Sequence, residues 1–330
     1  MTWGLIARAE PNRGLGVLTR NMYQNLNPDK TLVIRIDHEY AQETQVFPDA
    51  TVVDWAGGDL HEATIREWLE GLDTVVTAET FYDWRIVDWA REMGVRTVLY
   101  VMPELLKKEL LDGDMPRPDT FWYPTSWQPD IGRPWPSGPV LTVPCEQRPF
   151  VDFPTDTARF VHVAGKPALG DRNGTGTLAL ASKIGRGMSL TVYGQGALPR
   201  FNSNVRVQNG PDDKWTMYEQ AHVLVMPRRF GGLCLPVIEA LSCGLAVMMP
   251  DISPNADWPI VKVSAEPDRV IEMPCGSVRT YVTNQRELAG KIVSGQKKVS
   301  EVSHFMQRSR DYATKNSWAN RRGDFLAHLD

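Results

Sequence analysis

The sequence has 330 residues, of which 42% are apolar and 23% charged, and its formal net charge is −4. This length is sufficient for two domains with separate hydrophobic cores, and the composition excludes a disordered chain. The apolar runs are all shorter than the roughly 20 residues that a membrane span needs, and the negative net charge disfavours non-specific binding to nucleic acid or anionic lipid.

The first half alternates short apolar runs with segments of helical period. We predict strands at 2–8, 31–36, 51–55, 73–78, 96–101, 120–124 and 138–143, and helices at 14–26 and 82–93. Strands separated by helices of about a dozen residues are typical of βαβ units and a mostly parallel sheet.

A second set of alternating elements follows a segment rich in proline and polar residues at 144–157, which we interpret as a domain linker. We predict strands at 159–165, 189–194, 222–227 and 244–250, and helices at 175–184, at 215–220 and around Glu239. The sequence therefore predicts an α/β protein with two doubly wound halves. Such sheets bind ligands at the carboxyl ends of their strands, so we expect a cleft there.

The N-terminal residues and the spacing of the cysteines indicate a cytoplasmic protein. The first residues, MTWGLIARAEPNRG, lack the basic start, apolar core and cleavage site of a signal peptide. The four cysteines form no CxxC pair, which is typical of buried thiols in a reducing compartment. Between Lys291 and Arg322 eight Lys or Arg residues stand against Glu301 and Asp311. That excess fits a solvated helix face or, alternatively, a basic surface that docks the acceptor.

Two loops that follow predicted strands carry glycines and cations. Gly14 and Gly16 lie where a helix begins, so their backbone N–H groups suit a phosphate, although an ordinary tight turn fits them equally well. Lys166 and Arg172 come after the strand at 159–165, and a pair of cations at that position favours a diphosphate. Gly194 ends the next strand and allows a ligand to approach the backbone closely.

The stretch PRRFGGLCLPVIEALSCG (227–244) places a single acid, Glu239, on an otherwise apolar helix. A carboxylate there can accept two hydrogen bonds from the vicinal hydroxyls of a ribose, with Lys166 and Arg172 near the phosphates. Glu239 is therefore predicted to bind the sugar of a nucleotide.

The segment PRRFGGLCLPVIEALSCGLAVMMPDISPN resembles the signature of retaining GT-B glycosyltransferases, in the large family that includes sucrose and mannosyl transferases. The family pattern is E-G-x-G-L-P-x-x-E-A-x-A-x-G-x-P-V. The stretches FVHVAGK, RNGT and SLTVYGQG are also similar to family segments, whereas the first half matches only in layout. The resemblance implies two Rossmann-like domains. Residues 1–148 would bind the acceptor, 156–313 would bind the donor, and a C-terminal helix at 314–330 would pack back onto the first domain.

The resemblance also implies a donor site. Glu239 matches the family's second glutamate, which holds the nucleotide ribose, while Gly231 replaces the first. The family's diphosphate-binding arginine and lysine fall at Lys166 and Asn173. We expect Arg172 to replace that lysine, and Arg228 or Arg229 to occupy part of the lost glutamate's surroundings. The remaining donor-binding positions are Gly232, Leu233, Cys234 and Leu235.

The family's histidine after a first-domain strand is missing, because the corresponding stretch is YVMPE (100–104). We therefore predict that Glu104 and Glu79, which follow strand ends, supply polar groups to the active site. Asp112 and Asp114 form a D-x-D sequence but lie in a polar loop, and the histidines show no metal-binding spacing. The expected site holds no metal or cofactor.

Together with these residues, the resemblance implies transfer of a sugar from a nucleotide-diphosphate donor to an acceptor hydroxyl, with retention. The sequence leaves open a non-catalytic nucleotide-sugar binding module, or an epimerase or phosphorylase of the same shape. RNGT with RRFGGLCLP is also similar to compact transferases of actinobacterial phages. That similarity allows a virion protein or a hydroxymethylated DNA base as acceptor, in the host cytoplasm, while the family at large allows small glycosides and lipids. No membrane insertion is expected.

Overall fold

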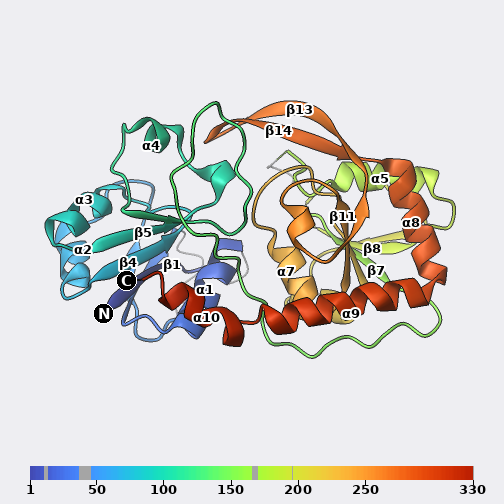
Figure 1. Cartoon of the computed structure of the whole chain (residues 1–330), viewed down its shortest axis with the longest axis horizontal. Helices are drawn as coiled ribbons and strands as arrows, with labels where there is room; N and C mark the ends of the chain where they lie inside the picture. Colours follow the sequence, from blue (N-terminus) through green and yellow to red (C-terminus); the bar gives the residue numbers. More distant parts are fainter. Residues whose placement is uncertain (11–13, 37–45, 166–169, 195, 330) are drawn as a thin grey trace. The chain divides into compact units, whose positions relative to one another are not determined.

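The computed structural model of the chain describes residues 1–10, 14–36, 46–165, 170–194 and 196–329. It divides the chain into two compact units. The first comprises Met1–Val143, Glu272–Ser277 and the C-terminal residues from Arg321, and the second comprises Pro144–Ile271 and Val278–Asn320. Figure 1 shows the elements of both.

The first unit contains a six-stranded parallel sheet in the order β3-β2-β1-β4-β5-β6. Its strands are β1 (Trp3–Arg8), β2 (Lys30–Arg35), β3 (Thr51–Asp54), β4 (Thr74–Ala78), β5 (Arg96–Tyr100) and β6 (Thr120–Trp122). Its helices are α1 (Gly14–Leu26), α2 (Glu62–Leu69), α3 (Arg85–Glu92), the short 3-10 helix η3 (Pro103–Leu105) and α4 (Lys108–Asp112). The central strands β1 and β4 are apolar because both faces of the sheet are covered.

The second unit repeats this topology with the order β12-β11-β10-β7-β8-β9. Its sheet strands are β7 (Phe160–Val163), β8 (Leu190–Tyr193), β9 (Val205–Gln208), β10 (Val223–Val225), β11 (Ala246–Pro250) and β12 (Ile260–Val263). Its helices are α5 (Thr175–Ile184), α6 (Trp215–Glu219), α7 (Leu235–Ser242), η5 (Asn255–Asp257), α8 (Gln285–Lys297) and α9 (Val299–Lys315). Helix α9 packs beside α7 and β11 (Figure 1).

Both sheets have the classic doubly wound strand order, so the predicted fold class is confirmed. In each sheet the order reverses between the first and fourth strands, which are β1 and β4 in the first unit and β7 and β10 in the second. Ligands of open α/β sheets bind beyond the carboxyl ends of strands at this switch point. The loops after these four strands are therefore where a site is expected.

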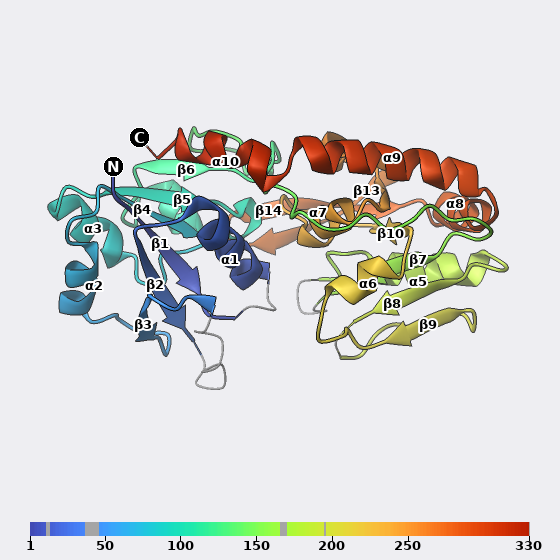
Figure 2. The same ribbon diagram turned by 90° about the horizontal axis from the view of Figure 1, so that it is seen from below.

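Several features differ from the sequence prediction, among them one expected strand, one hairpin and the C-terminal helix. The expected strand at 138–143 is wrong: the structure has only an isolated bridge between Val140 and Tyr123, because prolines at 139 and 144 remove ladder donors. A two-stranded hairpin, β13 (Ala265–Met273) and β14 (Gly276–Thr283), was not predicted. The predicted C-terminal helix is the shorter α10 (Trp318–Leu326), which lies beside β6 in Figure 2.

The end of the chain contributes to the core of the first unit. Phe325 is 2% exposed and packs edge-on against Trp122, with ring centroids 6.1 Å apart, and beside Tyr100 at 6.3 Å. The carbonyl oxygen of Leu329 accepts hydrogen bonds from Arg96 at 2.8 Å and from Thr74 at 3.3 Å. The last residues thereby cap one side of strands β4 to β6.

Candidate active site

The loops after β7 and β10 lie against each other at the switch point of the second unit. The side-chain amide of Asn173 donates hydrogen bonds to the carbonyls of Val163 and Ala164, at 3.1 and 3.3 Å, and so holds the end of β7. Gly174 has φ +74°, and a Cβ there would lie 1.9 Å from the carbonyl oxygen of Pro227. The close contact between the two loops therefore requires glycine at 174.

Arg229 joins these loops to the hairpin. Its backbone N–H donates to the carbonyl of Arg172 at 2.9 Å, and its guanidinium donates to the Gly170 carbonyl at 2.9 Å. The same guanidinium is bound to the Asp268 carboxylate at 2.6 Å and is almost fully buried. A charge-assisted hydrogen bond of this kind fixes the loop geometry. Arg229 therefore links the predicted donor loops to each other and to the hairpin.

The other predicted cations lie in different surroundings. Arg228 is 1% exposed, and its Nε donates to the carbonyl of Phe230 at 2.8 Å. Arg172 is half-buried on the 170–174 loop. Lys166, the remaining cation, falls outside the described residues. Of the predicted diphosphate ligands that the structure describes, Arg172 is the cation with the most access to solvent.

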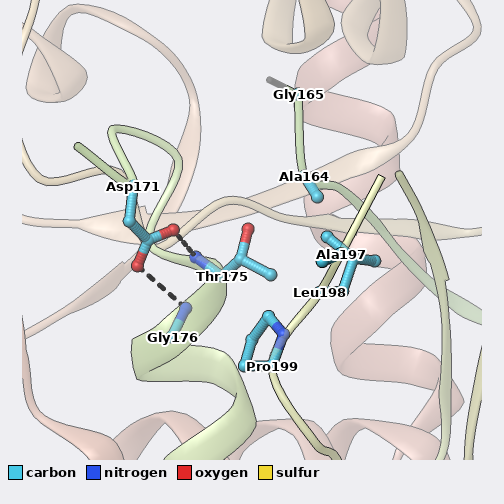
Figure 3. Close-up of a pocket in the computed structure, with 8 residues that line it drawn as sticks. All are labelled: Ala164, Gly165, Asp171, Thr175, Gly176, Ala197, Leu198 and Pro199. Carbon is cyan, nitrogen blue, oxygen red and sulfur yellow. Dashed lines mark hydrogen bonds between the residues drawn. The ribbon is translucent and has the colours of Figure 1, made fainter. Parts of the chain in front are cut away.

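A small pocket opens between the loops after β7 and β8, beside the start of α5 (Figure 3). Its volume is about 250 Å³, and its lining is mostly apolar. The residues that line it are Ala164, Gly165, Asp171, Thr175, Gly176, Ala197, Leu198 and Pro199. Gly194 packs so closely that a Cβ there would lie 2.7 Å from Leu198. Gly194 thus shapes this wall of the pocket.

The start of α5 already carries an anionic partner. The carboxylate of Asp171 accepts hydrogen bonds from the backbone N–H groups of Thr175 at 2.7 Å and Gly176 at 2.9 Å (Figure 3). A carboxylate at a helix N-terminus is stabilised by the helix dipole. Because Asp171 already accepts hydrogen bonds from these two N–H groups, we do not expect the phosphate of a nucleotide sugar to bind them in this conformation.

Glu239 is the fifth of the eight residues of α7, and both of its carboxylate oxygens have partners. Oε1 accepts from Nζ of Lys214 at 2.5 Å, and Oε2 accepts from the hydroxyl of Tyr218 at 2.7 Å. The side chain of Glu239 is 11% exposed and that of Lys214 is 20% exposed. Burial, followed by the adjacent Glu239 carboxylate, raises the pKa of Tyr218 well above its usual value, so this phenol stays a proton donor.

Sequence reasoning missed Lys214 and Tyr218. They lie four residues apart at the start and on one face of α6, which follows the loop after β9. The signal was present in PDDKWTMYEQ, where a lysine and a tyrosine have helical spacing. The partner of a buried carboxylate is a tertiary contact, however, and no local pattern specifies it.

The chain enters α7 through the glycine loop of the recognised motif. Gly231 has φ +109°, a conformation that residues with a side chain rarely adopt. Cys234 is the N-cap residue, Leu235 is the first residue of the helix, and Pro236 follows in the first turn. The backbone N–H groups at this end and the positive end of the helix dipole suit an anion. Gly232 and Leu233 are buried in the same turn.

In the first unit, the predicted phosphate loop has a structural explanation. A Cβ at Gly16 would lie 1.6 Å from the carbonyl oxygen of Glu10, so glycine is needed for the first turn of α1 to approach Glu10. Gly14 is exposed at the start of α1. At the end of β1, Arg8 and Glu10 form an ion pair of 2.7 Å. This close approach of backbone to backbone accounts for Gly16 without a ligand.

The two predicted acids of the first unit lie in unlike surroundings. Glu79 directly follows β4, is half-buried and has φ +67°, a strained value for a residue with a side chain. Its N–H donates to the Tyr100 carbonyl at 2.9 Å. Glu104 lies in η3 and is only 1% exposed. Burial of the Cys275 thiol, followed by the nearby charge of Glu104, raises the pKa of that thiol to about 11. Glu79 is thus the more accessible of the two.

The D-x-D sequence has a structural role. Asp112 ends α4 and forms ion pairs with Lys108, at 2.8 Å, and with Arg133. Within the described ranges, no three His, Cys, Asp or Glu side chains gather as metal ligands do. None of the helices in the described part of the chain has the length and hydropathy to cross a membrane.

Comparison with known proteins places this geometry in a class. Residues 201–258 match the family model described as "Glycosyl transferases group 1". That segment contains Lys214, Tyr218, the glycine loop and Glu239. No curated protein sequence matches the chain significantly.

Solved structures match over the full length. Anabaena Alr3699/HepE in complex with UDP and glucose has a TM-score of 0.71 at 10% identity, covering 100% of this chain and 99% of that one. The glycosyltransferase from Rickettsia africae has a TM-score of 0.67 at 11% identity, with coverages of 99% and 97%. Sucrose-phosphate synthase from Thermosynechococcus elongatus has a TM-score of 0.64 at 13% identity, with coverages of 100% and 99%.

The fold is that of the GT-B glycosyltransferases, and the segment that the family model matches belongs to a group 1 glycosyl transferase domain. The chain carries this domain in its second unit, so the resemblance found in the sequence is confirmed, as is the prediction of an enzyme.

Proposed function

We propose that the chain moves a sugar from a nucleotide-diphosphate donor to an acceptor hydroxyl, with retention and without a metal ion. The main support is the carboxylate of Glu239, which is held by Lys214 and Tyr218 four residues after the first residue of α7. Each carboxylate oxygen accepts more than one hydrogen bond, so Glu239 retains capacity for two ribose hydroxyls. A pre-oriented acceptor of this kind is what selective binding of a nucleoside needs.

UDP-glucose is the first donor to test, since the similar Alr3699/HepE has been solved with UDP-glucose. In our proposal the uridine lies near the pocket of Figure 3, which offers a largely apolar surface beside the backbone of Gly194. The diphosphate faces Arg172, Asn173 and Lys166, as well as the N–H groups of Gly232, Leu233 and Leu235. Because Gly231 replaces an acid and has no side chain, other residues must determine which donor sugar is bound.

The chemistry that these groups support is electrostatic. The bond between the anomeric carbon and the donor phosphate oxygen breaks while a bond from the acceptor oxygen forms on the same face. The proton of the acceptor hydroxyl passes to the leaving phosphate. The negative charge that develops on the diphosphate is stabilised by cations and by fixed backbone N–H dipoles. On this proposal no protein nucleophile and no metal ion take part.

The acceptor is proposed to bind at the carboxyl end of the first unit's sheet, where Glu79 and Gly14 lie after β4 and β1. Glu104 is proposed as a supporting acid in the same unit. A phage virion protein or a hydroxymethylated DNA base in the host cytoplasm is the proposed acceptor, and the four buried free cysteines are consistent with that reducing compartment.

Calorimetry of UDP binding tests the donor site. Glu239→Gln is expected to weaken binding by about 1–3 kcal/mol, the scale of a lost charged acceptor. The matched control is Glu219→Gln, because Glu219 is exposed, pairs with Arg148 at 3.1 Å and belongs to the neighbouring helix α6. Equal UDP affinity in a folded Glu239→Gln protein would remove the main support for the proposal.

Product analysis tests the reaction. Incubation with UDP-glucose and an acceptor panel is expected to give a glycoside of unchanged anomeric configuration by NMR, with full activity in excess EDTA. Release of free sugar, or a requirement for inorganic phosphate, would instead identify an epimerase or phosphorylase. Donor binding without turnover across the panel would favour a binding module.

A further inference from the structure

A second and larger cavity lies in the second unit, away from the loops described above. Its volume is about 480 Å³. Its floor includes Phe160, Val223 and Ala246, the first residues of β7, β10 and β11, which are paired side by side across the sheet. The cavity therefore lies toward the amino ends of these strands, whereas the donor loops follow their carboxyl ends.

Small residues explain why this space stays unfilled. Ala246 is a small residue of the floor, and Ser294 and Gly295 of α8 form part of the roof. A Cβ at Gly295 would lie 3.0 Å from the ring of Phe160, so glycine lets the helix backbone approach the aromatic floor. Protein interiors rarely leave voids larger than a water molecule. A cavity of several hundred Å³ with an apolar lining is the size of a ligand site.

The walls of the cavity are apolar and its rim is cationic. Trp258, Phe305 and Val302 complete the interior. Three cations, Lys262, Lys291 and Arg308, stand at its edge against one carboxylate, Glu301.

Two of the cations are adjacent, because Nζ of Lys291 donates to the backbone carbonyl of Lys262 at 2.8 Å. Lys262 and Lys291 also pair with Asp251 at 3.0 Å and Glu287 at 3.1 Å, which are solvent-accessible contacts of the weak kind. An anionic group can therefore compete for both ammonium groups at little cost.

We propose that this cavity binds one free amphiphile, an apolar chain with an anionic head group of the fatty-acid class. The chain lies between the sheet and helices α8 and α9, and the head group contacts Lys262 and Lys291. A bilayer is disfavoured as the source of the lipid, because attachment to a membrane needs exposed apolar side chains around the mouth. Among the described residues, the large exposed apolar side chains all belong to other segments.

Titration calorimetry with sodium decanoate, kept below its micelle concentration, tests the site. We expect saturable binding of one molecule, no competition by UDP, and no binding of butyrate, which lacks the apolar chain. The double variant Lys262→Gln/Lys291→Gln is expected to lose at least tenfold in affinity. Lys297→Gln is the control, because Lys297 is exposed on the same helix and lies outside the cavity lining.

A second variant tests the cavity itself. Ala256 is exposed and borders the cavity, so Ala256→Trp is expected to obstruct it and abolish decanoate binding. Ala63→Trp, at an exposed position of α2 in the other unit, is the matched control. Decanoate affinity that is unchanged in both the lysine double variant and Ala256→Trp would overturn the proposal. Binding to phosphatidylglycerol vesicles without binding of decanoate would overturn it as well.

Discussion

The hydroxyl of Tyr218 lies 2.7 Å from Oε2 of Glu239, and this bond places the carboxylate before any donor arrives. Lys214 holds the other oxygen at 2.5 Å, so the orientation of Glu239 is set from two sides. Both partners come from α6, while the acid comes from α7. The packing of α6 on α7 therefore lets two different connections of the second sheet hold one carboxylate.

The Tyr218 contact leads to a first prediction. Tyr218→Phe removes a hydrogen-bond donor to a charged acceptor without creating a cavity, so UDP affinity and the KM for the donor should worsen by about 1–2 kcal/mol. The effect on kcat should be small, because the lost interaction is made equally in the ground state and the transition state. Calorimetry and steady-state kinetics give both quantities. Tyr23→Phe in α1 is the control, and a fall in kcat alone would contradict a positioning role.

Gly231 gives a second prediction. Its φ of +109° is costly for any residue with a Cβ, so Gly231→Ala should lower the free energy of unfolding by about 1–3 kcal/mol. Gly231→Glu, which restores the family's acid, should be destabilised as well and should not raise activity.

The control for this prediction is Gly290→Ala, where a Cβ would meet nothing within 4 Å in the middle of α8. That substitution should instead stabilise by about 0.5–1 kcal/mol, because alanine favours a helix. Urea unfolding measures the free energy of unfolding of both variants. Similar changes for Gly231→Ala and Gly290→Ala would show that the positive φ of Gly231 does not determine the cost.

Two buried histidines predict a loss of stability in acid. Burial lowers the pKa of His162 to about 4, and burial with the Arg159 charge lowers that of His222 to about 4. His162 bridges the Val225 carbonyl at 2.8 Å and the Thr175 hydroxyl at 2.9 Å. The unfolded chain binds these protons near pH 6.5 and the folded chain only near pH 4. Unfolding free energy therefore falls as pH drops through this window.

The magnitude follows from linkage. Each histidine costs about 1.4 kcal/mol per pH unit below its unfolded pKa, or roughly 2 kcal/mol between pH 7 and pH 5. Urea unfolding at both pH values measures the difference. His222→Asn, whose amide oxygen can still accept from Arg159 N–H, should remove about half of the histidine contribution. The exposed His304→Asn should leave it unchanged. If the free energy of unfolding of His222→Asn falls between pH 7 and pH 5 as much as that of the unmodified protein, burial of the His222 imidazole does not cause the loss of stability in acid.

The sequence predicted the parts of this molecule that depend on local pattern. Apolar strands such as β4 and β10 and the glycine turn before α7 were all recognisable, because period, turn chemistry and motif are encoded within a few residues. The edge strands β9 (VRVQ) and β12 (IVKV) were not, because each contains a charged residue and has no apolar run longer than two residues. The sequence placed Arg229 in the donor site but did not reveal its bond to Asp268, 39 positions away. That ion pair joins a loop to a hairpin that was not predicted, so it depends on the tertiary fold.

The C-terminal residues give the last prediction. Phe325→Ala would leave a cavity against Trp122 and Tyr100 and should cost about 3–5 kcal/mol in the free energy of unfolding of the first unit. Truncation after Asn320 should cost more, because the Leu329 carbonyl no longer accepts from Arg96 and Thr74. Hydrogen exchange of the amides in β4 and β5 reports on this unit directly, and Arg322→Ala, at an exposed position, is the control.

Sugar transfer should be lost in the truncated protein while UDP still binds, since every proposed donor ligand lies between Lys166 and Glu239 and the acceptor is proposed to bind the first unit. If amides of β4 and β5 in the truncated chain exchange as slowly as in the full-length protein, then Phe325 and Leu329 do not stabilise the first unit.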